Sequence, residues 1–178
     1  LDAAKKAWAY LEATPGDGVG FKNPDSIVTG EYDDTNDTDE RYWALAELYK
    51  TTGDETYLNA MKEYSADKIG TGLGWQNVGL YGMYAYLTSG SSDDYYDSVK
   101  AQFDQAVDAA YANVQADAYG VALGSSDYTW GSNMNVANNG MLFLMANRIE
   151  ANPDYVKAAN AQVDYLMGTN TNSYCFIT

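Results

Sequence analysis

The chain has 178 residues, a formal net charge of −15 and no histidine. This length suits one domain with a hydrophobic core, and the negative charge argues against nucleic acid or an anionic membrane as partner, because both would repel it. The absence of histidine removes the usual general base and nearly every catalytic zinc site, and no apolar run reaches the ~18 residues of a membrane-spanning helix.

Apolar side chains at helical spacing predict seven helices and almost no strand. The third helix is expected to start at an N-cap, Asp54, and the last at Asn152 with Pro153 in its first turn. Gly79 and Gly82 are expected to let the fourth helix pack closely against a neighbour. Short turns alternate with long aromatic loops, which favours an α/α toroid over an up-down bundle. The expected helices cover about 3–13, 37–50, 54–70, 78–88, 93–115, 134–150 and 152–168.

The stretch from Thr29 to Tyr49 carries an unusual concentration of acid. Its first half holds six carboxylates without one basic residue, and its second half is an amphipathic helix. Crowded carboxylates repel one another, so two interpretations are open: a solvated acidic loop that caps the helix, or a site for Ca²⁺, which takes several oxygen ligands from a short loop. An EF-hand is excluded because, counted from Asp33, Thr38 replaces the required glycine and Ala44 the required glutamate.

The aromatic residues are unusual in kind, with seventeen tyrosines and four tryptophans against four phenylalanines. Tyr and Trp join an apolar ring to a polar tip, which suits half-wet surfaces such as clefts and sugar-binding subsites. Trp75 and Trp130 stand at expected loop–helix junctions, which favours a place in a cleft. The alternative is that each is a core tryptophan.

Three runs of sequence resemble the catalytic domain of glycoside hydrolase family 9, in the family's order and at similar intervals. The resemblance covers nearly the whole chain and lies with the later part of that domain. It implies an all-α fold of about seven helices that forms part of an (α/α)6 barrel. It also implies a single partial catalytic domain over residues 1–178, truncated at both ends. The runs are TGEYDDTNDTDERYWALAELYKTTGDETYL (29–58), YTWGSNMNVANNGM (128–141) and YVKAANAQVDYLMGTNTNSYCFIT (155–178).

The family consists mostly of cellulases, so the resemblance implies hydrolysis of β-1,4-glucan with inversion by an Asp base and a Glu acid. The base lies in an Asp-Ala-Gly-Asp motif and the acid beyond a Pro-His-His-Arg motif, and neither motif occurs in this sequence. We therefore expect no catalytic residue in this chain, and we expect it to need the remainder of the domain. Two carboxylate pairs of the acidic loop, Asp37 with Asp39 and Asp33 with Glu40, lack a recognisable partner motif.

The resemblance also implies binding residues. In some members the acidic stretch holds calcium, which makes Ca²⁺ the expected structural cofactor. The matching positions are Thr35, Asn36, Asp39 and Glu40. Trp75, Trp130 and Tyr174 match positions in or beside the substrate cleft, where an indole face can stack on the apolar face of a glucose ring. Some members place an arginine where Met134 stands, so a sugar contact from that position is not expected.

Three hypotheses about function are open. The chain is part of a secreted endo-β-1,4-glucanase that acts on cellulose or another β-1,4-glucan, with the extracellular location implied by the resemblance alone. Alternatively, it is a non-catalytic α/α module that binds glucan, or a structural α/α domain whose aromatic residues form the core. Hydrolysis of carboxymethylcellulose separates the first from the second, and affinity for cellulose separates the second from the third.

Overall fold

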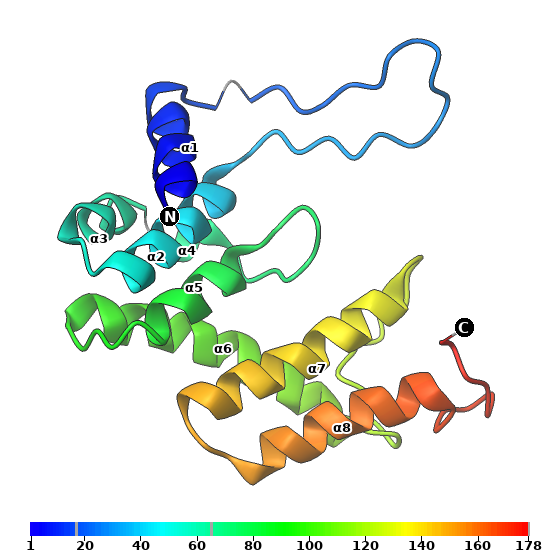
Figure 1. The fold of residues 1–178 in the computed structure, drawn as a ribbon. Coiled ribbons are helices and arrows are strands. Elements are labelled where there is room, and N and C mark those ends of the chain that lie inside the picture. The colour runs from blue at the N-terminus through cyan, green and yellow to red at the C-terminus, as the bar shows by residue number, and fades with distance from the viewer. Residues whose placement is uncertain (17, 65, 178) are drawn as a thin grey trace. The chain divides into compact units, whose positions relative to one another are not determined.

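The computed structural model describes residues 1–16, 18–64 and 66–177, and within these ranges it contains eight helices and no strand (Figure 1). All but the four-residue α4 have eight residues or more, which confirms an all-α chain with about seven helices. The chain divides into two compact units, residues 1–96 and 97–178, with the boundary in the first turn of α6. The helices are α1 (Asp2–Ala13), α2 (Thr38–Thr52), α3 (Glu55–Lys62), α4 (Ala66–Ile69), α5 (Gly79–Leu87), α6 (Asp94–Ala116), α7 (Ser132–Ile149) and α8 (Pro153–Met167).

Local sequence signals explain where several helices begin and end. The carboxylate of Asp54 accepts a hydrogen bond from the backbone N–H of Thr56 (2.9 Å) and so caps α3. Just before it, Gly53 takes the left-handed conformation (φ 67°) that ends α2. Asn152 caps α8 in the same way, accepting from the N–H of Asp154 (3.0 Å). Both N-caps are confirmed, because capping depends only on residues that are close in sequence.

The single helix expected over residues 54–70 is instead divided into α3 and α4. The N–H groups of Glu63 and Tyr64 donate to carbonyl oxygens three residues back, those of Ala60 (3.3 Å) and Met61 (3.1 Å). Hydrogen bonds of this kind tighten the last turn of a helix and end it. The apolar spacing runs on through this point, so the sequence pattern does not indicate the break.

In the unit of residues 1–96, α2 is the central helix and packs against α1, α3 and α5. Gly82 of α5 lies so close to Tyr42 of α2 that an added Cβ would stand 2.5 Å from the Cδ1 atom of the ring. This confirms the close helix packing expected from the glycines. Tyr42 is completely buried, and burial, followed by the neighbouring Tyr95, raises its pKa.

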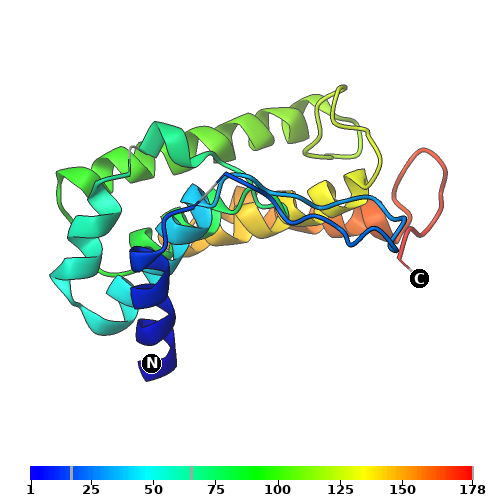
Figure 2. The same ribbon diagram turned by 90° about the horizontal axis from the view of Figure 1, so that it is seen from above.

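Between α1 and α2, residues 18–37 form two extended segments that lie side by side (Figures 1 and 2). We call these residues the arm. Lys22 on the outgoing segment forms ion pairs with Glu31 (3.0 Å) and Asp33 (2.7 Å) on the returning one. Side chains alternate along extended chain, so Tyr32, between these two acids, points away from Lys22.

In the unit of residues 97–178, α7 and α8 pack along each other, with Gly140 against the side chain of Gln162. Gln162 is completely buried. Its amide donates to the carbonyl oxygens of Gly120 (2.8 Å) and Ala158 (2.9 Å) and accepts from the N–H of Ala122 (2.9 Å). These bonds hold the loop between α6 and α7 against α8. A small apolar cluster beside them contains Val121, Leu123, Val136 and Leu166, with Tyr165 and Phe176 packed on it.

Candidate functional site

The acidic stretch leads into the first turn of α2, where its carboxylates have very different surroundings. Asp39 is buried, and its Oδ2 atom accepts a hydrogen bond from the N–H of Val78 at 2.6 Å, which ties the start of α2 to the start of α5. In contrast, Asp34 Oδ2 and Glu40 Oε2 are buried without a hydrogen-bond partner. Burying a charged oxygen without a donor is costly, so a cation at this point would stabilise the fold. We call Asp34, Asp39 and Glu40 the acidic cluster.

The protonation of Glu40 reflects this shortage of positive charge. Burial, followed by the carboxylates of Asp39 and Asp34, raises the pKa of Glu40 from 4.5 to about 7. The two basic residues between positions 18 and 41 are engaged elsewhere, because Lys22 binds acids of the arm and Arg41 binds Asp37 and two carbonyl groups. The acidic cluster therefore receives no ion pair from them.

The four predicted calcium ligands are Thr35, Asn36, Asp39 and Glu40. The last two belong to the acidic cluster, whereas the side chains of the first two are exposed. The Oδ1 atom of Asn36 already accepts hydrogen bonds from the N–H (3.3 Å) and hydroxyl (2.6 Å) of Thr38. Asp34 was not among the predicted ligands, and it carries one of the two buried oxygen atoms that lack a hydrogen-bond partner. Within the described ranges, no group of three or more His, Cys, Asp or Glu side chains is arranged to hold a metal ion, so the calcium site stays a prediction.

Trp75 lies on the turn that leads into α5, with half of its surface exposed (50 %). The turn is held by Asn77, whose amide accepts from the N–H of Gly72 and donates to the carbonyl oxygen of Ile69 (3.1 Å). The indole ring makes an edge-to-face contact with Tyr32 of the arm, with ring centroids 5.2 Å apart and an interplanar angle of 84°. Sequence reasoning did not identify Tyr32, because nothing local connects it with Trp75.

The other two predicted sugar-binding residues lie in the unit of residues 97–178. Trp130 immediately precedes the N-cap of α7, Gly131, and is almost fully exposed (93 %). Tyr174 is also exposed, and Asn170 holds its backbone by donating to its carbonyl oxygen (2.8 Å) and accepting from its N–H (3.3 Å). None of the three side chains is part of the core, so all of them are accessible to a ligand.

Three of the four acids in the two carboxylate pairs, all except Glu40, make structural contacts. Asp37 Oδ2 accepts from Arg41 Nε (2.8 Å), and Asp33 pairs with Lys22. The buried Asp39 accepts from a backbone N–H, as described above. A catalytic acid and base need two carboxyl groups that face the substrate, and each of the two pairs contains at least one carboxylate that is already bound within the protein.

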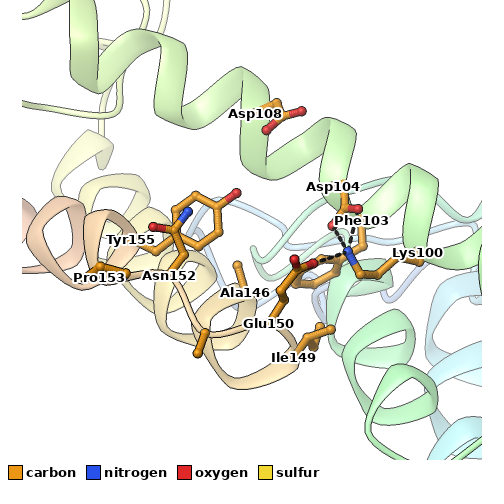
Figure 3. Close-up of a pocket in the computed structure, with 11 residues that line it drawn as sticks. Lys100, Phe103, Asp104, Asp108, Ala146, Ile149, Glu150, Asn152, Pro153 and Tyr155 are labelled. Carbon is orange, nitrogen blue, oxygen red and sulfur yellow. Dashed lines mark hydrogen bonds and ion pairs between the residues drawn. The ribbon is translucent and has the colours of Figure 1, made fainter.

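A cavity of about 270 Å³ lies between α6 and the turn that joins α7 to α8 (Figure 3). The amino group of Lys100 bonds there to Asp104 (2.7 Å) on its own helix and to Glu150 (3.3 Å) at the end of α7. This lysine therefore links α6 to the α7–α8 turn. Because its charge is already shared between two carboxylates, we assign the cavity no ligand.

Among the described residues, no helix combines the length and the apolarity that are needed to cross a membrane. The described part of the chain is all-helical and exposes two indole rings, on the loops directly ahead of α5 and α7. The model of the family described as glycosyl hydrolase family 9 matches residues 1–178. The chain belongs to this family, and the resemblance noted in its sequence is confirmed.

Known proteins of the family match along the whole chain. Endoglucanase D of Acetivibrio thermocellus is 34% identical over 184 residues, which cover 100% of this chain and 29% of that protein. A mutant of a thermostable endoglucanase from Alicyclobacillus acidocaldarius has a TM-score of 0.90 at 35% identity, covering 100% of this chain and 34% of the other. AaCel9A in complex with a cellobiose-like isofagomine has a TM-score of 0.89 at 35% identity, covering 99% and 34%.

This chain therefore spans about a third of the length of the proteins it matches. Its close superposition on solved family 9 enzymes confirms the predicted fold, an all-α part of an (α/α)6 barrel.

Proposed function

We propose that this chain is part of the catalytic domain of a secreted cellulase of the endo-β-1,4-glucanase type. The proposed reaction is hydrolysis of β-1,4-glucosidic bonds in cellulose or a related glucan with inversion. The Asp base and Glu acid lie outside these residues, and the remainder of the domain is needed. Family membership over residues 1–178 and the names of the relatives support this activity.

The role proposed for the chain itself is to bind the glucan. The observation that carries it is the exposure of Trp75 and Trp130 on the loops directly ahead of α5 and α7, with Tyr174 as a third exposed ring. An exposed indole presents an apolar face, and the C–H face of a glucose ring is a suitable apolar partner for it. Inverting hydrolysis needs two carboxyl groups roughly 6.5–9.5 Å apart with a water between base and sugar, and stacking would hold the chain in place for it.

Binding of cellohexaose to this chain, measured by calorimetry, tests the proposal. We expect Trp75→Ala and Trp130→Ala each to weaken binding about tenfold, while the melting temperature stays within a few degrees of the wild type because neither ring is buried. Phe21→Ala is the matched control, since Phe21 is an exposed aromatic residue (67 %) of the arm without a proposed role. Unchanged affinity in both tryptophan variants would exclude the stacking role.

A non-catalytic glucan-binding α/α module is the alternative function. It shares the exposed rings and predicts the same affinities, but it predicts no hydrolysis when the chain is joined to the family's remaining catalytic residues. Release of reducing ends from carboxymethylcellulose by this chain within a complete catalytic domain distinguishes the two.

We further propose that the acidic stretch binds Ca²⁺ as a structural ion. The orphaned oxygen atoms Asp34 Oδ2 and Glu40 Oε2 fit a hard cation that takes carboxylate oxygens. Asp39 and Glu40, with Asp34, would hold the ion, and the exposed Thr35 and Asn36 could supply hydroxyl or carbonyl oxygens. The ion would neutralise the cluster and brace the start of α2. A calcium titration that leaves the melting temperature unchanged would exclude this site.

A further inference from the structure

We propose that Tyr32 is a positioning residue for Trp75, holding the indole ring in the orientation in which it stacks on a glucan chain. The role assigned to Tyr32 rests on the proposed function of Trp75 and extends the binding surface to the arm. The two rings are nearly perpendicular (84°), and their centroids are 5.2 Å apart. This is the geometry of a favourable edge-to-face pair, in which the positive edge of one ring meets the negative face of the other.

Trp75 needs such support because its turn fixes the backbone but not the ring. Asn77 binds backbone groups on the N-terminal side of the turn, and the N–H of Gly74 donates to the carbonyl oxygen of Asn77 (2.9 Å). None of these bonds restrains the two side-chain torsions of the indole. An exposed ring that rotates freely loses conformational entropy when it stacks on a ligand. A perpendicular neighbour reduces this loss, because it restricts the ring before the ligand arrives.

Tyr32 can restrain Trp75 because it is itself held in place. The acids on either side of it, Glu31 and Asp33, are both bound to the amino group of Lys22 at 3.0 and 2.7 Å. The N–H of Asn23 adds a hydrogen bond to Glu31 Oε1 (2.9 Å). Hydrogen bonds to Asp33 and Glu31 raise the pKa of Lys22. With both neighbours turned toward Lys22, the tyrosine ring is directed to the opposite side, where it meets Trp75.

The arm and the Trp75 turn are also joined at their bases. Asp39, two residues beyond the arm, accepts the hydrogen bond from Val78, three residues beyond Trp75. The two ring-bearing segments therefore leave a common anchor and meet again at the ring pair. The contact with Trp75 is made by the ring of Tyr32, and within the described residues its hydroxyl group has no hydrogen bond, so phenylalanine should replace the tyrosine and alanine should not.

The test uses the 178-residue chain labelled with 5-fluorotryptophan, whose four tryptophans give four ¹⁹F resonances, the one from Trp75 being identified by its loss in Trp75→Phe. We expect Tyr32→Ala to move the Trp75 resonance and leave that of Trp130 in place, and Tyr32→Phe to keep the wild-type position. Phe21→Ala, which removes another exposed ring of the arm, should move neither resonance.

Cellohexaose affinity supplies the second measurement. Tyr32→Ala should weaken binding about three- to tenfold, the range that one edge-to-face pair allows, and Tyr32→Phe less than twofold. In a Trp75→Ala background, Tyr32→Ala should have no further effect, because Tyr32 acts through the indole. The melting temperature of Tyr32→Ala should fall by no more than the loss of one ring pair allows, a few degrees below that of Phe21→Ala, so that the chain stays folded in the binding assay.

Three results would overturn the assignment or limit it. A Trp75 resonance that does not move in Tyr32→Ala refutes positioning, whether or not the chain binds glucan. An equal loss of affinity from Tyr32→Ala with and without Trp75 shows that Tyr32 contacts the glucan itself, which also refutes it. If Trp75→Ala leaves affinity unchanged while Tyr32→Ala still moves the resonance, the proposed function of Trp75 fails and the ring contact stands.

Discussion

Replacing Glu40 by glutamine should change the stability of the chain in opposite directions without and with calcium. In calcium-free protein the pKa of Glu40 is about 7, against 4.5 for an unperturbed glutamate. Between these two values the folded chain binds more protons than the unfolded chain. The contribution of Glu40 to stability is therefore greatest below pH 4.5 and is lost as the pH rises to about 7, where the buried carboxylate becomes charged.

The structure also indicates how large this loss is. A rise in the pKa of Glu40 from 4.5 to about 7 corresponds to a loss of roughly 3 kcal/mol for a group that is not screened by solvent. Glu40 is only partly buried, so solvent screening reduces the loss to about 1–2 kcal/mol. For a chain of 178 residues this is a change of roughly 3–6 °C in melting temperature. Glutamine keeps the size of the side chain and carries no charge, so Glu40→Gln should remove the loss.

Calcium should reverse the sign of the effect. An ion that binds only the folded chain stabilises it by about 2.7 kcal/mol at one hundred times its dissociation constant. Glutamine is a poorer ligand for Ca²⁺ than a carboxylate, and much of this gain should disappear in Glu40→Gln. The variant is therefore expected to be more stable than the wild type at pH 8 in a chelator, and less stable than the wild type at pH 8 in millimolar calcium.

Thermal unfolding followed by circular dichroism, from pH 5 to pH 8, measures both effects. Glu12→Gln is the control, because Glu12 is an exposed carboxylate in the last turn of α1. If the melting temperatures of the wild type and Glu40→Gln differ by the same amount at every pH in chelator, the burial of an unpaired charge at Glu40 is refuted. An equal rise in melting temperature on adding calcium would refute its role as a ligand.

Other predictions concern the packing and the polar network. Gly82→Ala should lower the free energy of unfolding by about 1–3 kcal/mol, because its Cβ would meet the ring of Tyr42, whereas Gly30→Ala, with open space around it, should change it little. Gln162→Leu should cost about 3 kcal/mol in denaturant unfolding, because it leaves one N–H and two carbonyl groups of the backbone without their partner. Asp93→Asn should lower the free energy of unfolding at pH 7 by about 1 kcal/mol. A hydrogen bond from Lys62 lowers the pKa of Asp93 from 3.8 to about 2. The stability that this partly exposed carboxylate contributes is present above pH 3.8 and is lost as the pH falls toward 2.

Local features of the fold could be predicted from the sequence. The N-caps at Asp54 and Asn152 and the glycine end of α2 depend on residues within one turn of each other. The break between α3 and α4 was missed, because Met61 and Tyr64 continue the apolar spacing through a point where the hydrogen bonds change. In α1 the helical spacing of Ala4, Ala7 and Trp8 indicated the helix, but it did not indicate that only Trp8 would be buried. Short side chains at the right spacing do not reach a neighbouring helix.

The candidate site depended on longer-range contacts, which sequence patterns do not report. The exposure of Trp75 and Trp130 followed from their places at loop–helix junctions, and it was anticipated. The pairing of Trp75 with Tyr32 and the bond from Val78 to Asp39 join residues that are far apart in sequence. Such contacts become visible only when the arm and the α5 turn have been placed in space.

Most of the crowded carboxylates in the acidic stretch have a hydrogen-bond or ion-pair partner in the folded chain. The sequence places no base among the six carboxylates, and the fold brings donors from outside: Lys22 for Glu31 and Asp33, Arg41 for Asp37, and a backbone N–H for Asp39. What remains unpaired is one buried oxygen atom on Asp34 and one on Glu40. The repulsion expected from six acids is thus reduced to two buried oxygen atoms that lack a hydrogen-bond partner. It follows that neutralising Glu31, Asp33 or Asp37 should leave the response to calcium unchanged, whereas neutralising Asp34 should weaken it as Glu40→Gln does.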